Sequence, residues 1–122
     1  MMRNDASTRE RGHAAETLAK CYLEAQGMTF LERNVELCGA EVDLIMEDKD
    51  AWVFVEVRAR ENCRDIHPLE TITRDKQLKV IRVATIYLCN AGCYQTREVR
   101  FDAVAVSLAD NSIEWIKAAF TP

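Results

Sequence analysis

The feature that most constrains the fold is a pair of adjacent, largely apolar segments, residues 41–47 and 51–60, separated by the polar turn 48–50. Apolar segments of this length on either side of a short polar turn predict two β-strands that form a hairpin, with side chains pointing alternately to its two faces. A turn centred between residues 49 and 50 sets Asp43 against Glu56, so both carboxylates share one face, with Cβ atoms about 5 Å apart. The other face is apolar throughout, and we expect it to be core: Val42, Leu44, Met46, Val53, Val55 and Val57.

The rest of the chain switches between helical and strand periodicity. Apolar residues at helical spacing predict a helix from Thr8 to Gln26, with Gly27 ending it, and a second helix over 71–90 that Thr71 or Thr73 could cap. The order α-β-β-β-α-β-β predicts a mixed sheet with helices packed on it. The other expected segments are an arm at 1–7 before a single domain at 8–122, strands at 28–37, 98–108 and 112–117, and a polar loop at 61–70.

Composition narrows the functional classes. A chain of 122 residues fits one domain, and no stretch approaches the roughly 20 apolar residues that span a bilayer. The polar N-terminus lacks a signal-peptide pattern, so we expect a cytoplasmic location and no membrane partner. The five cysteines have no metal-site spacing and are expected to be small buried or half-buried thiols. The net charge of −4 is evidence against nucleic-acid binding, although basic residues outnumber acidic ones between positions 58 and 82.

The facing carboxylates carry the chemical information in the sequence. Two like charges on an otherwise apolar hairpin are costly, and burial raises the cost. A divalent cation such as Mg²⁺ compensates for both charges through oxygen ligands of this kind. Alternatively, Arg58, Arg60 or backbone donors satisfy the pair in a structural salt-bridge network. The residues alone leave both interpretations open.

These residues also resemble a known pattern. Asp43 followed by Glu56-Val57-Arg58 is similar to the D…(D/E)-x-K signature of the PD-(D/E)XK nuclease superfamily, with arginine in the lysine position. From about Arg11 to Val106 the chain resembles the YraN-like family of small bacterial proteins, related to archaeal Holliday-junction resolvases. The resemblance rests on Glu41-Val42-Asp43-Leu44-Ile45 and Val53-Phe54-Val55-Glu56-Val57 at this separation, with matches at Gly12, Glu16, Arg33-Asn34, Arg60, Lys76 and Arg100-Phe101-Asp102.

The resemblance implies an α/β fold with the restriction-endonuclease-like α-β-β-β-α-β core, a mixed central sheet flanked by helices. It implies a metal-dependent endonuclease that acts on DNA, including branched or junction structures. Asp43 and Glu56 would hold Mg²⁺ or Mn²⁺, often joined by the main-chain carbonyl of Val57, while Glu16 assists and Arg58 stabilises phosphate charge. The expected nucleic-acid-binding residues are Arg60, Lys76 and Lys79.

Other interpretations remain beside the nuclease. Arginine at position 58 and the acidic net charge favour a non-catalytic nucleic-acid-binding or protein-interaction module on the same scaffold. An oligomer built by edge-strand pairing of the C-terminal strands is a third, and the sequence does not predict the oligomeric state. Trp52 and Phe54 are expected to pack against a helix, and Asp102 to form a salt bridge or a strand-end hydrogen bond.

Overall fold

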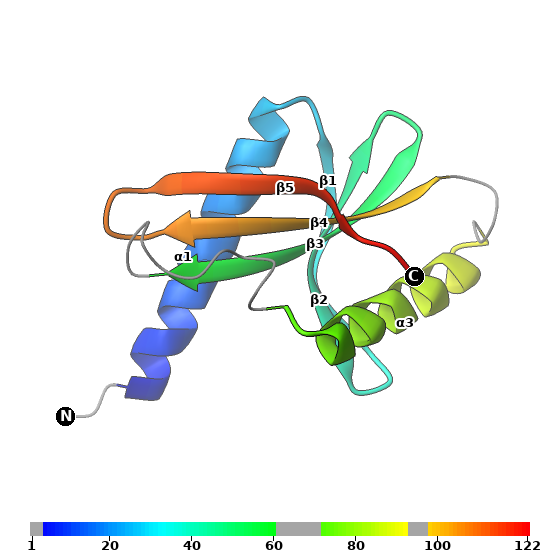
Figure 1. Cartoon of the computed structure of the whole chain (residues 1–122), viewed down its shortest axis with the longest axis horizontal. Coiled ribbons are helices and arrows are strands. Elements are labelled where there is room, and N and C mark those ends of the chain that lie inside the picture. Colours follow the sequence, from blue (N-terminus) through cyan, green and yellow to red (C-terminus); the bar gives the residue numbers. More distant parts are fainter. Residues whose placement is uncertain (1–3, 61–71, 93–97) are drawn as a thin grey trace.

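The computed structural model describes residues 4–60, 72–92 and 98–122, and it shows one mixed sheet with a helix on each side (Figure 1). This arrangement confirms the predicted α-β-β-β-α-β core. The predicted loop at 61–70 lies outside the described residues. The elements are α1 (Asn4–Ala25), β1 (Thr29–Leu37), β2 (Ala40–Asp48), β3 (Ala51–Arg60), α3 (Arg74–Asn90), β4 (Val99–Ser107) and β5 (Ser112–Phe120).

The five strands lie in the sheet in chain order, from β1 to β5. Neighbours are antiparallel except β3 and β4, which run parallel and are connected through α3. In the β2–β3 hairpin, Glu47 pairs with Trp52 and Ile45 with Phe54, so the predicted register is confirmed. The helix α3 begins after Thr73, whose side chain accepts the main-chain N–H of Lys76, one of the two caps expected.

Two hydrophobic clusters fill the space between the sheet and its helices. The cluster under α1 contains Ala15, Ala19 and Leu23 of the helix together with apolar residues of β2, β3 and β4. The cluster under α3 contains Trp52 and Phe54, and both rings make edge contacts with Tyr87 of that helix. These two aromatic residues pack against a helix, as expected. Both faces of the sheet are therefore covered by hydrophobic core. A charged side chain that lies between the sheet and either helix is removed from water.

Some expectations were wrong in detail. Helix α1 begins at Asn4, so residues 4–7, expected in the arm, are helical, because no proline or glycine stops the helix before Thr8. Val42 was expected on the same face as Leu44, but it belongs to the cluster under α3 while Leu44 belongs to the cluster under α1, so the alternation of β2 is broken at Asp43. The cysteines that the structure describes are exposed, not buried: Cys21, Cys38 and Cys89.

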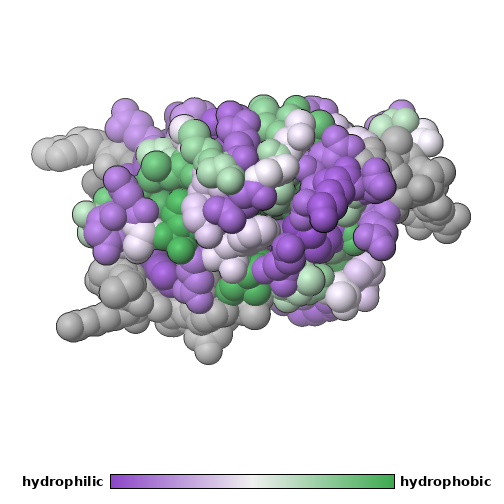
Figure 2. Space-filling model, turned by 90° about the horizontal axis from the view of Figure 1, so that it is seen from above, coloured by the Kyte–Doolittle hydropathy of each residue, from purple (hydrophilic) through white to green (hydrophobic). Residues whose placement is uncertain are grey.

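The last strand runs three residues further than the predicted 112–117, through a bulge at which Ala118 has φ 55°. Bulges twist a sheet edge away from partners, which disfavours pairing of this edge with another chain. From above, hydrophobic residues form separate groups between hydrophilic ones (Figure 2). Among the described residues, Leu78 and Val99 are the large hydrophobic side chains that are exposed. Neither helix in the described part of the chain is long and apolar enough to cross a bilayer.

Candidate active site

Asp43 on β2 and Glu56 on β3 lie at the end of the hairpin that is remote from its turn. The ladder between the strands runs from the Asp48–Ala51 pair to the Leu44–Val55 pair, and the next step in that register brings Asp43 beside Glu56. Here Oδ2 of Asp43 accepts the main-chain N–H of Val57 at 2.8 Å. The hairpin therefore brings the two predicted carboxylates together and fixes one of them through the backbone.

The carboxylate of Glu56 is enclosed by the protein, with 0% of the residue exposed. Nζ of Lys76, on the first turn of α3, lies 3.4 Å from Oε1, but neither oxygen accepts a hydrogen bond from the described parts of the chain. Burial, followed by the charge of Asp43, raises the pKa of Glu56 to about 8, against the opposing charges of Lys76 and Arg58. Without a bound cation, Glu56 is therefore protonated in most of the protein molecules at neutral pH.

The pKa of Asp43 is raised as well. Burial and, after it, the negative charges of Glu16 and Glu41 raise the pKa of Asp43 to about 6, while the hydrogen bond from the Val57 N–H and the charge of Lys76 oppose this rise. The charges of neighbouring carboxylates therefore add to the effect of burial on the pKa of both Asp43 and Glu56.

Glu16, the third predicted carboxylate residue of the site, lies on α1, and its carboxylate accepts hydrogen bonds from two side chains of β1. Its Oε1 accepts Nη2 of Arg33 at 3.2 Å, and its Oε2 accepts Nδ2 of Asn34 at 3.1 Å. Within the described ranges, no three His, Cys, Asp or Glu side chains are close enough to hold one metal ion together. Glu16 therefore lies near Asp43 without joining it and Glu56 in a common ligand set.

The arrangement fits Mg²⁺ or Mn²⁺. The two oxygens of Glu56 are buried acceptors that lack hydrogen-bond donors among the described residues, which is costly unless a cation binds. Mg²⁺ is commonly bound through one or two carboxylates, with water and substrate phosphate completing the shell. Asp43 and Glu56 supply that number of carboxylates. No further protein carboxylate is needed for such a site.

The structure gives the predicted basic residues different surroundings. Lys76 faces Glu56, and Arg58 is half-buried on the same strand as Glu56, whose pKa its charge lowers. Arg60 instead forms an ion pair with Glu114 of β5 at 3.2 Å. Lys79 is exposed and pairs with Asp75, one turn earlier in α3, at 3.4 Å. Of the predicted cations, Lys76 and Arg58 are the two placed at the carboxylates.

Sequence comparison identifies the family. The model of the "Uncharacterised protein family UPF0102" matches residues 15–106. The chain belongs to the UPF0102 family. A UPF0102 protein of Photorhabdus laumondii is 41% identical over 110 residues, covering 89% of this chain and 86% of the relative. One of Pectobacterium carotovorum is 40% identical over 113 residues, covering 92% and 94%, and one of Vibrio cholerae 38% over 116 residues, covering 94% and 95%. UPF0102 is the YraN-like family, so that resemblance is confirmed, while the names of these relatives state no activity.

Sequence reasoning missed two contacts at the UPF0102 site. Lys76 was assigned to nucleic acid, whereas the structure shows it as the ion-pair partner of Glu56. The signal was present, because the predicted cap Thr73 places Lys76 in the first turn of the helix that crosses back over Glu56's face of the sheet. The amide of Asn34 on Glu16 had no such signal, since it depends on how β1 packs beside α1.

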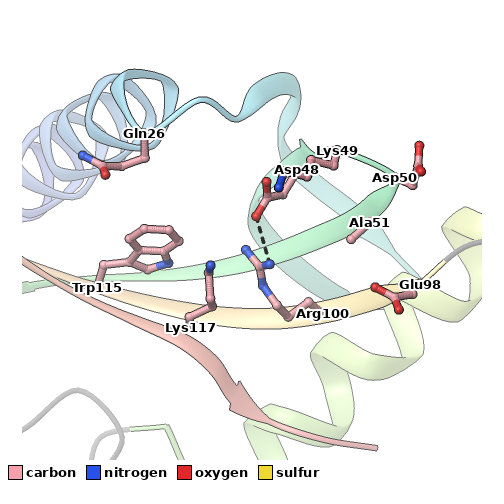
Figure 3. Close-up of a pocket in the computed structure, with 9 residues that line it drawn as sticks. All are labelled: Gln26, Asp48, Lys49, Asp50, Ala51, Glu98, Arg100, Trp115 and Lys117. Carbon is pink, nitrogen blue, oxygen red and sulfur yellow. Dashed lines mark hydrogen bonds and ion pairs between the residues drawn. The ribbon is translucent and has the colours of Figure 1, made fainter.

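A second polar region of the UPF0102 chain lies at the opposite end of the hairpin (Figure 3). An open pocket of about 1050 Å³ is lined there by Gln26, Asp48, Lys49, Asp50, Ala51, Glu98, Arg100, Trp115 and Lys117. The formal charges of its three cationic and three acidic residues cancel. Arg100 already binds Asp48 at 3.0 Å and Asp102 at 2.9 Å. The residues that line this pocket therefore carry no net formal charge.

Proposed function

We propose that this protein is a metal-dependent phosphodiesterase that acts on DNA, including branched or junction structures. The observation that carries the proposal is the buried Glu56 carboxylate beside Asp43, with two oxygens that no described donor satisfies. Perturbed carboxylates of this kind are common at catalytic sites. The family resemblance points to the same residues and to DNA as the substrate.

Each residue has a role in this proposal. Asp43 and Glu56 hold Mg²⁺ or Mn²⁺, which polarises a phosphate oxygen and lowers the pKa of a water molecule when bound. The Val57 N–H fixes one oxygen of Asp43 in place. Lys76 lowers the pKa of Glu56 and so favours its ionised, ligating form. Arg58 stays protonated, so it can bind phosphate oxygens through two N–H groups but cannot act as a base.

The test is a cleavage assay with Mg²⁺ and with Mn²⁺ on junction, flap and single-stranded DNA. Asp43→Asn and Glu56→Gln should each abolish cleavage. Asp50→Asn is the matched control, because it makes the same change in the same hairpin at the exposed turn. Absence of cleavage by the parent, or equal cleavage by the Asp43→Asn and Glu56→Gln variants, would contradict the enzymatic proposal.

The second candidate is a non-catalytic nucleic-acid-binding or protein-interaction module. Arginine in the lysine position of the motif and the net charge of −4 favour it. Calorimetry with Mn²⁺ together with the cleavage assay separates the two candidates, since the metal site of an enzyme should bind Mn²⁺ at millimolar or lower concentration. Mn²⁺ binding without cleavage supports a module that kept the site, and absence of Mn²⁺ binding supports a module that lost it.

A further inference from the structure

The pairing of β1 with β2 is interrupted directly beside the candidate site. Arg33 pairs with Leu44 and Val35 with Val42, and the pair between them, Asn34 with Asp43, is missing from the ladder. Asn34 has φ 54°, in the left-handed region. Asparagine visits this region more readily than most residues, because its short polar side chain can form local hydrogen bonds. The irregularity therefore coincides with one carboxylate of the site.

Other non-glycine residues with a left-handed backbone conformation lie either in turns or inside strands. Cys38, Lys49 and Asn111 adopt positive φ in the tight connections between strands. Ala118 and Asn34 adopt it inside strands. At Ala118 the distortion turns the main-chain N–H toward the buried carboxylate of Asp102, at 2.9 Å. Backbone distortions within strands thus accompany contacts to carboxylates in this protein.

At Asn34 the carboxylate that is contacted is Glu16. The Asn34 amide donates to Oε2 at 3.1 Å, and Arg33 donates to Oε1 at 3.2 Å. Arg33 is itself anchored to α1 by hydrogen bonds to the His13 carbonyl and the Thr17 hydroxyl. Both oxygens of Glu16 are therefore fixed from β1, and the carboxylate cannot turn away from the sheet without breaking these bonds.

We infer that Asn34 is a positioning residue of the candidate site: its left-handed backbone and side-chain amide fix Glu16 beside Asp43. This inference rests on the proposed function, in which the site binds a divalent cation. The affinity of a carboxylate site for such a cation depends on how many negative charges surround it and on how rigidly they are held. Glu16 supplies a charge outside the ligand set, and Asn34 supplies the rigidity.

The test measures Mn²⁺ affinity by calorimetry for the parent, Asn34→Gly, Glu16→Gln and the double variant. Glycine accepts the left-handed backbone, so Asn34→Gly removes the amide without adding strain. Asn111→Gly is the matched control, since it is the same change at φ 59° in the turn between β4 and β5. Loss of groups that orient a metal site weakens affinity about 10-fold or more. We expect about 10-fold weaker Mn²⁺ binding for each single variant, no further loss in the double variant, and parental affinity for Asn111→Gly.

Two results would overturn the inference. One is parental Mn²⁺ affinity in Asn34→Gly, which would make Asn34 a structural residue only. The other is an additive loss in the double variant, which would mean that Asn34 does not act through Glu16. If the parent binds no Mn²⁺, the proposed function fails. The denaturant midpoints of the same four metal-free proteins then test whether Asn34 and Glu16 interact. A non-additive shift of the midpoints supports the Asn34–Glu16 contact, and an additive shift excludes it.

Discussion

Two carboxylates in the described part of the chain are fully buried, and their surroundings are opposite. Asp102, on β4, is bound by Nε and Nη2 of Arg100, by the indole N–H of Trp115 and by the main-chain N–H of Ala118, at 2.9–3.0 Å. Glu56, on the neighbouring β3, has one lysine at 3.4 Å and no hydrogen bond from the described residues. Both have 0% of their surface exposed, so burial alone does not distinguish them.

The difference shows which carboxylate stabilises the fold and which one costs stability. A buried charge is tolerated when its hydrogen-bonding capacity is filled, and Asp102 meets that condition. Glu56 does not, and it lies beside a second acid whose charge raises its pKa. Selection for stability alone has no reason to keep such a residue, whereas function often retains strained groups. Asp102 is therefore structural, as the sequence suggested, and Glu56 is the better candidate for function.

The largest expected effect follows removal of the well-satisfied charge. Asp102→Asn should lower the free energy of unfolding by about 3–5 kcal/mol, because it leaves Arg100 with a broken buried pair. Glu56→Gln removes a charge from an equally buried carboxylate and should leave stability unchanged or raise it. Urea unfolding of both variants at pH 8 measures the contrast. Similar losses in the two variants would erase the distinction between the carboxylates.

The pH dependence of stability should show the same distinction. The pKa of Glu56 is raised from 4.5 to about 8, so the folded protein binds its proton more tightly than the unfolded chain does. The resulting stability is present in full below pH 4.5 and is lost as the pH rises through 8. A perturbed group contributes at most about 1.4 kcal/mol per pH unit, so Glu56→Gln should gain about 2 kcal/mol on the parent between pH 5 and pH 7. Urea midpoints at these two pH values measure the gain, and parallel pH profiles of parent and variant would contradict it.

The cations beside the two carboxylates allow a matched substitution. Arg100→Lys should cost about 2 kcal/mol, because a lysine cannot reproduce the guanidinium fork that bridges Asp102 and Asp48. Arg58→Lys should change stability by less than about 0.5 kcal/mol, because the charge near Glu56 is retained. Thermal melts of the two variants compare them directly. In the cleavage assay, strong activation of Arg58→Lys would show that arginine attenuates the natural site.

The hairpin explains why much of the fold and part of the site were predictable. The short polar turn and the apolar face of the hairpin, which must be buried, leave one register, and this register places Asp43 next to Glu56. Helix starts and strand ends were less accurate. Helix α1 begins before its apolar pattern, and β5 continues past its own pattern because Asp102 binds the main chain at Ala118. Local sequence does not encode such a long-range contact.

The cations were predicted less well than the carboxylates for the same reason. The sequence showed that basic residues follow Glu56, but it did not show which of them would form ion pairs with other carboxylates. Arg60 pairs with Glu114, more than fifty residues later in the chain, and Lys79 with Asp75. Whether Lys76 reaches Glu56 depends on how α3 crosses the sheet. Side chains that point across elements therefore need the three-dimensional structure.

The smallest expected effect concerns Asp43, and it connects strain to metal binding. Asp43→Asn should leave the metal-free protein as stable as the parent or up to about 1 kcal/mol more stable, because the amide oxygen can still accept the Val57 N–H while the repulsion from Glu56 disappears. The parent should gain about 1.4 kcal/mol when Mn²⁺ is at ten times its dissociation constant, and the variant should gain nothing. Thermal melts of both proteins with and without Mn²⁺ measure these values, with Asp50→Asn as the control that keeps the gain. A structural ion pair at Asp43 predicts the reverse, a loss of several kcal/mol in the metal-free variant and no effect of Mn²⁺ on the parent. That result would place Asp43 with Asp102 as a carboxylate that holds the fold together.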